Sequence, residues 1–367
     1  MRYVLLVALL ASTARADEPA LPIDAKRLRT ELEAVHKKHD LPAMGVAIVR
    51  SSGVVLVDVV GVRKRGGDAE ATVADRFHIG SDTKTMTALL VALLVQDEKL
   101  AYDTTLEKAL PDLAKKMHED FRPVTLGQLL THRAGLAANP PGGWLFPQNV
   151  PVQSVRTSAA KLALEAEPEI APGVKYAYSN LGYVVAGAIA ERAGKGDWES
   201  LMKKRIFAPL DMKTAGFGPM GTRGKVDQPL QHGEDGKPVE PGPKADNPPV
   251  MGPAGRVHCS LGDWGKFMAD QLKGAQGKEA LLPAEAYKKL HEPLAKGLDY
   301  TPGGWLYYKT SAGVFLSHDG SNTLNYACAV LVPSKDIAIL VVTNQGGKKA
   351  GAACLQLRDA LVKKLVP

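Results

Sequence analysis

The chain has 367 residues, of which 45% are hydrophobic and 23% are charged, and its formal net charge at pH 7 is +7. These values are ordinary for a globular protein, and this length is enough to bury a large core in one domain or two interleaved ones. Basic residues alternate with acidic ones, as in residues 26–31, which favours a solvated surface over nucleic-acid binding. The absence of repeats and low-complexity tracts excludes a solenoid or a disordered chain.

Residues 1–16 have the pattern of a secretory signal peptide. Arg2 is followed by the apolar run 3–11 and by the small-residue site Ala14-Arg15-Ala16, and the run is too short to span a membrane. We therefore expect an exported protein, periplasmic or secreted, with no stable membrane span and a mature chain that starts near Asp17.

The N-terminal part of the mature chain predicts one helix and a hairpin. Asp24 can cap a helix over residues 25–38. Two apolar stretches, 44–50 and 54–61, flank the turn Ser51-Ser52-Gly53, as in a β-hairpin.

The middle of the chain is predicted to be mainly helical. Residues 76–212 carry little strand signal and include helices over 126–130 and 180–194. Residues 216–255 hold so many glycines and prolines that we expect a long loop without regular structure, serving as a wall or lid.

Strands return toward the C-terminus. Residues 260–263 form a capping box that opens a helix, and residues 348–365 form the last helix. Four strands are predicted between them, at 304–310, 313–317, 326–332 and 337–343. The sequence therefore predicts an α+β fold, with one antiparallel sheet from residues 17–75 and 253–367, flanking helices, and a helical insertion over 76–252.

Ser81 and Lys84 stand at the start of an apolar helical repeat. Their spacing places both side chains on one face, within reach of each other. A serine hydroxyl becomes a good nucleophile when a neighbouring base takes its proton, and burial together with the helix dipole lowers the pKa of such a lysine. The pattern also occurs at Ser158/Lys161 and Ser200/Lys203, but only Ser81 follows a glycine turn and precedes a buried helix.

Tyr178 and Asn180 lie two residues apart just before a helix. A loop tyrosine usually packs its ring, and an asparagine before a helix is usually a cap. The functional alternative is that Tyr178 relays protons, if nearby cations favour its anion, while Asn180 either binds the substrate or holds Lys84.

A third candidate segment is Ser317-His318-Asp319-Gly320-Ser321, placed between two strands. It can be a surface turn. Alternatively, His318 lines the pocket, Gly320 lets a substrate lie along the strand edge, and the backbone N–H of Ser321 joins that of Ser81 in an oxyanion hole.

Three motifs in this order resemble those of the penicillin-recognising serine hydrolases: Ser81-x-x-Lys84, Tyr178-x-Asn180 and His318-x-Gly320. The nearest branch is that of class C β-lactamases, D-alanyl-D-alanine carboxypeptidases and related esterases, and segments 129–136 and 253–256 also resemble it. The resemblance implies a β-lactamase/DD-peptidase-like fold with Ser81 as the acylated nucleophile and Lys84 and Tyr178 sharing acid–base work. It implies that Asn180 has an orienting role in the active site and that His318 lines the third wall of the pocket.

The sequence departs from that branch at His318-Asp319, where its β-lactamases usually carry a lysine and a threonine. An imidazole titrates near neutral pH, and Asp319 would repel a substrate carboxylate if it faced the pocket. We therefore expect an exported serine hydrolase acting on an amide or ester, as a D-Ala-D-Ala-type carboxypeptidase or a carboxylesterase, on a small-molecule or peptide substrate. A class C-like β-lactamase and a non-catalytic peptide- or partner-binding relative stay as alternatives, and the oligomeric state is open.

No metal or organic cofactor is expected. Three cysteines, Cys259, Cys328 and Cys354, form neither a disulfide framework nor a metal pattern, and buried thiols are favoured although one pair could bond. The isolated histidines His36, His39 and His232 are interpreted as solvated side chains.

Overall fold

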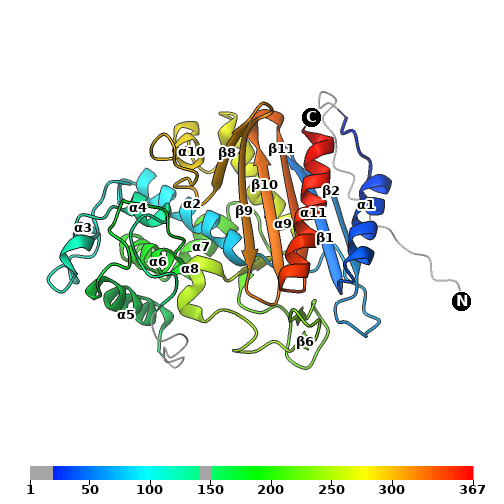
Figure 1. The fold of residues 1–367 in the computed structure, drawn as a ribbon, viewed down its shortest axis with the longest axis horizontal. Helices are drawn as coiled ribbons and strands as arrows, with labels where there is room; N and C mark the ends of the chain where they lie inside the picture. The colour runs from blue at the N-terminus through cyan, green and yellow to red at the C-terminus, as the bar shows by residue number, and fades with distance from the viewer. Residues whose placement is uncertain (1–19, 141–149, 367) are drawn as a thin grey trace, which may run out of the picture.

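A six-stranded antiparallel sheet lies at the centre of the computed structural model, which describes residues 20–140 and 150–366 (Figure 1). The predicted signal peptide, residues 1–16, lies outside these residues. The strands are β1 (Ala43–Arg50), β2 (Gly53–Gly61), β8 (Leu306–Thr310), β9 (Gly313–Ser321), β10 (Tyr326–Val332) and β11 (Ile337–Thr343). The sheet order is β2-β1-β11-β10-β9-β8, so the N-terminal hairpin pairs with the last C-terminal strand. The predicted sheet from both ends of the chain is confirmed.

Helices cover both faces of the sheet. The helices α1 (Ala25–Lys38) and α11 (Lys348–Leu365) pack side by side on one face, while α9 (Leu261–Ala275) packs on the other (Figure 1). The side chain of Asp24 caps α1 by accepting a hydrogen bond from the backbone N–H of Arg27. Ser260 caps α9 in the same way, but the carboxylate of Asp263 binds Thr214 instead of completing a capping box.

The inserted region is helical, as predicted, and lies on the left of Figure 1. Its helices are α2 (Thr83–Gln96), α3 (Leu106–Ala109), α4 (Leu126–Leu130), α5 (Val152–Glu165), α6 (Asn180–Gly194), α7 (Trp198–Met202) and α8 (Gly252–Gly255). Its shorter turns are η1 (Gly80–Asp82), η2 (Glu119–Phe121), the π-turn η3 (Lys203–Phe207) and η4 (Pro249–Met251). Outside this region, α10 (Ala284–His291) follows α9, and the turn η5 (Pro333–Lys335) joins β10 to β11. Helix α2 is buried over residues 83–94, which is typical of a helix in the middle of a large core.

The sequence predicts a glycine- and proline-rich segment, 216–255, without regular structure, and this prediction is partly wrong. It contributes the two-residue strands β4 (Gly216–Phe217), β5 (Gln231–His232) and β6 (Pro238–Val239). Strand β4 joins β3 (Phe77–His78) and β7 (Val257–Cys259) in a small sheet of order β3-β7-β4. This small sheet ties the loop to the segment that precedes Ser81.

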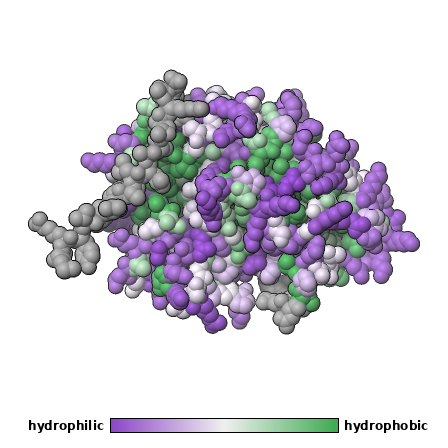
Figure 2. All heavy atoms as spheres, turned by 180° about the vertical axis from the view of Figure 1, so that it is seen from behind, coloured by the Kyte–Doolittle hydropathy of each residue, from purple (hydrophilic) through white to green (hydrophobic). Residues whose placement is uncertain are grey.

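Two hydrophobic cores lie on opposite faces of the main sheet, one toward the helical region and one under α1 and α11. The three cysteines are buried and free. The rear surface is mainly hydrophilic, with hydrophobic residues in small groups between polar ones (Figure 2). The described helices include none that is both long and apolar enough to cross a membrane. The domain limits at residues 75/76 and 252/253 stay a prediction.

Candidate active site

The turn that carries Ser81 is pressed against the end of β9. Gly80 has a φ of +53°, which favours glycine, and a Cβ at this position would lie 2.3 Å from the backbone nitrogen of Ser321. A Cβ at Gly320 would lie 1.9 Å from the carbonyl oxygen of Ile79 and 2.8 Å from the backbone nitrogen of Ser81. The two glycines therefore bring the backbone N–H groups of Ser81, in the turn η1, and of Ser321, at the end of β9, close together, as an oxyanion hole requires. The motif at 318–321 belongs to strand β9 itself rather than to a turn after it.

Lys84 is fully buried beside Ser81. Its Nζ lies 3.0 Å from Ser81 Oγ, 2.8 Å from Asn180 Oδ1 and 2.6 Å from the carbonyl oxygen of Ala254. Burial lowers the pKa of Lys84 well below its usual value. A neutral amine has two N–H groups and one lone pair, and the two carbonyl oxygens can only accept. The lone pair is thus left to face the hydroxyl of Ser81.

Asn180 holds the lysine, one of the two roles considered for it. Its Oδ1 accepts from Lys84, and its Nδ2 donates to Asn139 Oδ1 at 2.9 Å. Ser179, between Tyr178 and Asn180, caps α6, and its backbone N–H donates to Nδ1 of His132 at 3.0 Å. His132 therefore fixes the segment that carries both residues.

Tyr178 packs over Lys84, with 4.9 Å between Nζ and the ring centroid, and over His132, with 4.4 Å between ring centroids. Burial raises the pKa of Tyr178, and a hydrogen bond with Ser81 only partly opposes this. The phenol thus keeps its proton near neutral pH. The expectation that neighbouring cations favour its anion is wrong, because burial dominates and raises the pKa of Tyr178.

His318 is buried behind the cleft. Its Nδ1 lies 2.8 Å from the carbonyl oxygen of Asp319, so this nitrogen donates, and Nε2 accepts from the hydroxyl of Tyr300 at 3.0 Å. Burial, with a smaller effect of Lys84, lowers the pKa of His318 to about 3. The expectation of an imidazole that titrates near neutral pH is therefore wrong. The carbonyl of Asp319 can only accept, so it sets the tautomer, and the hydroxyl of Tyr300, which carried no signal in the sequence, donates to the remaining nitrogen.

Asp319 points away from Ser81. Alternation along β9 turns it toward α11, where it pairs with Nη1 of Arg358 at 3.3 Å and accepts from the hydroxyl of Tyr326 at 3.4 Å. It does not repel a substrate in the cleft.

A cavity of about 390 Å³ opens over Ser81. Its described lining residues are Ser81, Asn139, Pro140, Asn180, Asn247, Met251, Ala254, Ser321, Asn322 and Thr323. None of these is charged, and four are asparagines. Asn139, Asn247 and Asn322 carried no recognisable signal in the sequence, because they come from three separate loops.

The competing Ser-x-x-Lys pairs have ordinary roles. Ser158 is exposed on α5 and donates to the carbonyl of Ser154 at 2.9 Å. Ser200 donates to the carboxylate of Asp197 at 2.8 Å, next to the cap of α7. Within residues 20–140 and 150–366, no group of three or more His, Cys, Asp or Glu side chains could hold a metal ion.

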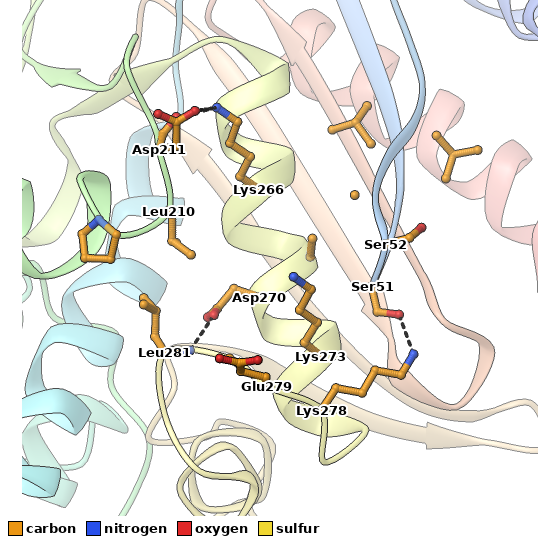
Figure 3. Close-up of a pocket in the computed structure, with 16 residues that line it drawn as sticks. Ser51, Ser52, Leu210, Asp211, Lys266, Asp270, Lys273, Lys278, Glu279 and Leu281 are labelled. Carbon is orange, nitrogen blue, oxygen red and sulfur yellow. Dashed lines mark hydrogen bonds and ion pairs between the residues drawn. The ribbon is translucent and has the colours of Figure 1, made fainter. Parts of the chain in front are cut away.

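A larger groove of about 980 Å³ lies between α9 and the turn of the β1–β2 hairpin, and contains none of the predicted site residues (Figure 3). Lys266 pairs there with Asp211, and Lys278 donates to Ser51. Its charged groups are partly engaged with one another, so the candidate site is the smaller cleft at Ser81.

A family model described as Beta-lactamase matches residues 28–363. The chain belongs to the β-lactamase family. It is a serine hydrolase of this family, whose members act on peptide or β-lactam substrates.

Sequence relatives are distant but cover most of the chain. Penicillin-binding protein 4 of Amycolatopsis lactamdurans is 26% identical over 338 residues, which are 89% of this chain and 87% of the relative. The D-alanyl-D-alanine-carboxypeptidase/endopeptidase AmpH of Escherichia coli is 25% identical over 320 residues, 83% of this chain and 80% of the relative.

The fold is similar to that of solved family members. The octameric penicillin-binding protein homologue from Pyrococcus abyssi superposes with a TM-score of 0.74 at 22% identity, covering 93% of this chain and 78% of that one. The predicted β-lactamase/DD-peptidase-like fold is confirmed.

Proposed function

We propose that the protein is an exported hydrolase that forms an acyl-enzyme on Ser81 and acts best on uncharged esters or amides, as a carboxylesterase does. The observation that carries this proposal is the cleft lining, in which carboxamides surround Ser81 and no described residue is charged. A substrate carboxylate would lose water there without meeting a cation, which is unfavourable. An uncharged carbonyl or amide group finds matching hydrogen-bond partners.

Lys84 is the base in the acylation step. Its lone pair takes the proton of Ser81 as Oγ bonds to the substrate carbonyl carbon, and the carbonyl oxygen becomes an oxyanion. The backbone N–H groups of Ser81 and Ser321 receive this charge. The support is the distance of 3.0 Å between Nζ and Oγ, together with the two carbonyl acceptors that occupy the N–H groups of Lys84.

Tyr178 is the acid in the same step. Its phenol gives a proton to the leaving alkoxide or amine as the bond to the carbonyl carbon breaks, and Lys84 returns its extra proton to the phenolate. Water then attacks the ester on Ser81. Tyr178 and Lys84 take a proton from this water and return one to Ser81, so the acid is released and Ser81 is restored. The raised pKa of Tyr178 supports a proton donor rather than a base.

D-alanyl-D-alanine carboxypeptidase activity is a second candidate, favoured by the relative AmpH. A peptide of that type carries its carboxylate next to the scissile bond and would meet asparagines here rather than a cation. A β-lactamase faces the same difficulty, and a non-catalytic peptide-binding relative would not need the Ser81–Lys84–Tyr178 arrangement.

Two measurements test the proposal. Intact mass after treatment with a fluorophosphonate should show one adduct, which peptide mapping places on Ser81 and which Ser81→Ala abolishes. Ser158→Ala and Ser200→Ala are the matched controls and should label like wild type. The second measurement is kcat/KM for p-nitrophenyl butyrate, a D-Ala-D-Ala peptide and a labelled penicillin. Absence of any adduct would support the binding relative, and a higher kcat/KM for the peptide or the penicillin would reverse the proposed preference.

Export is part of the proposal and rests on residues 1–16 alone. N-terminal sequencing of the protein from fractionated cells should find a chain starting near Asp17 outside the cytoplasm. A cytoplasmic protein that retains residue 1 would contradict it.

A further inference from the structure

One buried carboxylate, that of Asp246, contacts residues beside the turn that carries Ser81 and beside the end of β9 that carries Ser321. Asp246 belongs to the glycine- and proline-rich segment, and its side chain is only 2% exposed. It contacts Nε2 of His78 at 2.9 Å, Nδ2 of Asn322 at 3.0 Å and Nε of Arg256 at 3.2 Å. Its Oδ1 also accepts from the backbone N–H of Asn247 at 2.7 Å.

The contact with His78 leads to the nucleophile turn. Nδ1 of His78 accepts the backbone N–H of Gly80 at 3.0 Å, so its neutral form carries the proton on Nε2. Nε2 lies 2.9 Å from Oδ1 of Asp246, at ion-pair distance but without the geometry of a hydrogen bond. The imidazole is fully buried. A chain of carboxylate, imidazole and backbone amide thus ends at Gly80, whose conformation sets the direction of the next N–H, that of Ser81.

The contact with Asn322 leads to the other half of the oxyanion hole. Asn322 follows Ser321 directly, and its Nδ2 donates to Asp246 and to Oε1 of Gln231 at 2.7 Å. Its Oδ1 accepts the backbone N–H of Leu324 at 3.2 Å. The side chain of Asn322 therefore fixes the backbone just after Ser321 to the same carboxylate.

Charge supports this arrangement. Burial by itself would raise the pKa of Asp246, but His78, Arg256 and Asn322 outweigh burial and hold this pKa below its ordinary value. The group stays an anion near neutral pH, and an anion accepts stronger hydrogen bonds than a neutral acid.

We propose that Asp246 and His78 are positioning residues, which hold the N–H groups of Ser81 and Ser321 in register for the oxyanion. The inference rests on the proposed acyl-enzyme at Ser81. Neither side chain touches the reacting atoms, and each acts through the backbone it holds. A mispositioned donor lowers kcat on the order of 10- to 100-fold, because oxyanion stabilisation depends steeply on distance.

Two substitutions of one residue separate the roles of the imidazole. His78→Gln keeps a donor toward Asp246 but gives up the acceptor for Gly80, whereas His78→Asn places Oδ1 close to the position of Nδ1 and keeps that acceptor. We expect His78→Gln to lower kcat/KM for p-nitrophenyl butyrate by about 10- to 100-fold, and His78→Asn to lose several-fold less. Asp246→Ala should lose at least as much as His78→Gln. The control is His291→Gln, because His291 is another buried histidine and binds Gln271 in the core, away from the cleft.

The readout must exclude simple unfolding. Active sites are counted by fluorophosphonate titration, so each rate is given per competent Ser81, and the inhibition constant of phenylboronic acid reports on an oxygen held in the oxyanion hole. A positioning role predicts that kcat and boronate affinity fall in parallel while KM changes little.

Three results decide the matter. Equal losses for His78→Gln and His78→Asn would overturn the proposal, as would unchanged rates per titrated site. A loss as large in His291→Gln would also overturn it, by showing that general destabilisation is the cause. If wild type is not labelled at Ser81, it is the proposed function that fails.

Discussion

Selectivity for a substrate carboxylate should not depend on pH in the wild-type protein. With a pKa of about 3, His318 is charged in only about 0.3% of molecules at pH 5.5 and in about tenfold fewer for each further pH unit. The ratio of kcat/KM for an acidic ester to that for its neutral analogue should therefore be flat and low from pH 5.5 to 8.5. Taking the ratio cancels the titration of Lys84 and Tyr178, which both substrates share.

His318→Lys is the perturbation that should raise this ratio. A unit charge roughly 5 Å from a carboxylate, at an effective dielectric constant of about 20, contributes about 3 kcal/mol. Water in the cleft screens this to about 1–2 kcal/mol, so the ratio should rise by about 5- to 30-fold. The neutral substrate reports any general damage from the loss of the Tyr300 contact.

Asp319→Thr is the matched control, because Asp319 binds Arg358 on the far face of the sheet. It should leave the ratio unchanged. A wild-type ratio that falls as pH rises through about 6.5 would refute this reasoning, since it would show a charged imidazole at the carboxylate. A change of ratio in Asp319→Thr would refute the orientation assigned to that side chain.

Three further outcomes are expected. Lys84→Arg should slow fluorophosphonate labelling as much as Lys84→Ala, by about 10²- to 10⁴-fold, because arginine cannot give up its proton. A labelling rate near that of wild type would show that Lys84 is only an electrostatic support. Tyr178→Phe should slow hydrolysis of an ethyl ester about tenfold more than that of a p-nitrophenyl ester, whose leaving group needs no proton, and equal losses would rule out the phenol as the acid. Burial lowers the pKa of His291 in the folded protein to about 3, below its ordinary value of 6.5. The unfolded state therefore binds more protons than the folded state below pH 6.5. The free energy of unfolding then falls as pH falls, by up to about 1.4 kcal/mol per pH unit. Urea unfolding from pH 7 to 4 should show a shallower decline in His291→Gln, and an unchanged slope would contradict this assignment.

Local features of this protein could be predicted from its sequence because they depend on neighbours along the chain. The helix over 25–38 follows from the capping residue Asp24, and the last helix has its predicted bounds, 348–365. Alternating or continuous apolar residues predicted the strands, and the spacing of Ser81 and Lys84 placed both on one face. The order of the three motifs was enough to predict the family and the fold.

Only the tertiary structure decided the chemistry of the site. Whether an ionisable group is charged depends on burial and on partners distant in the chain, so neither the neutral state of His318 nor the proton on Tyr178 was evident from residue type. Strand alternation implies that Asp319 and His318 face opposite sides, but the helices that cover the sheet decide which side holds the cleft. The contact of Asp246 with His78 joins segments that only the fold brings together.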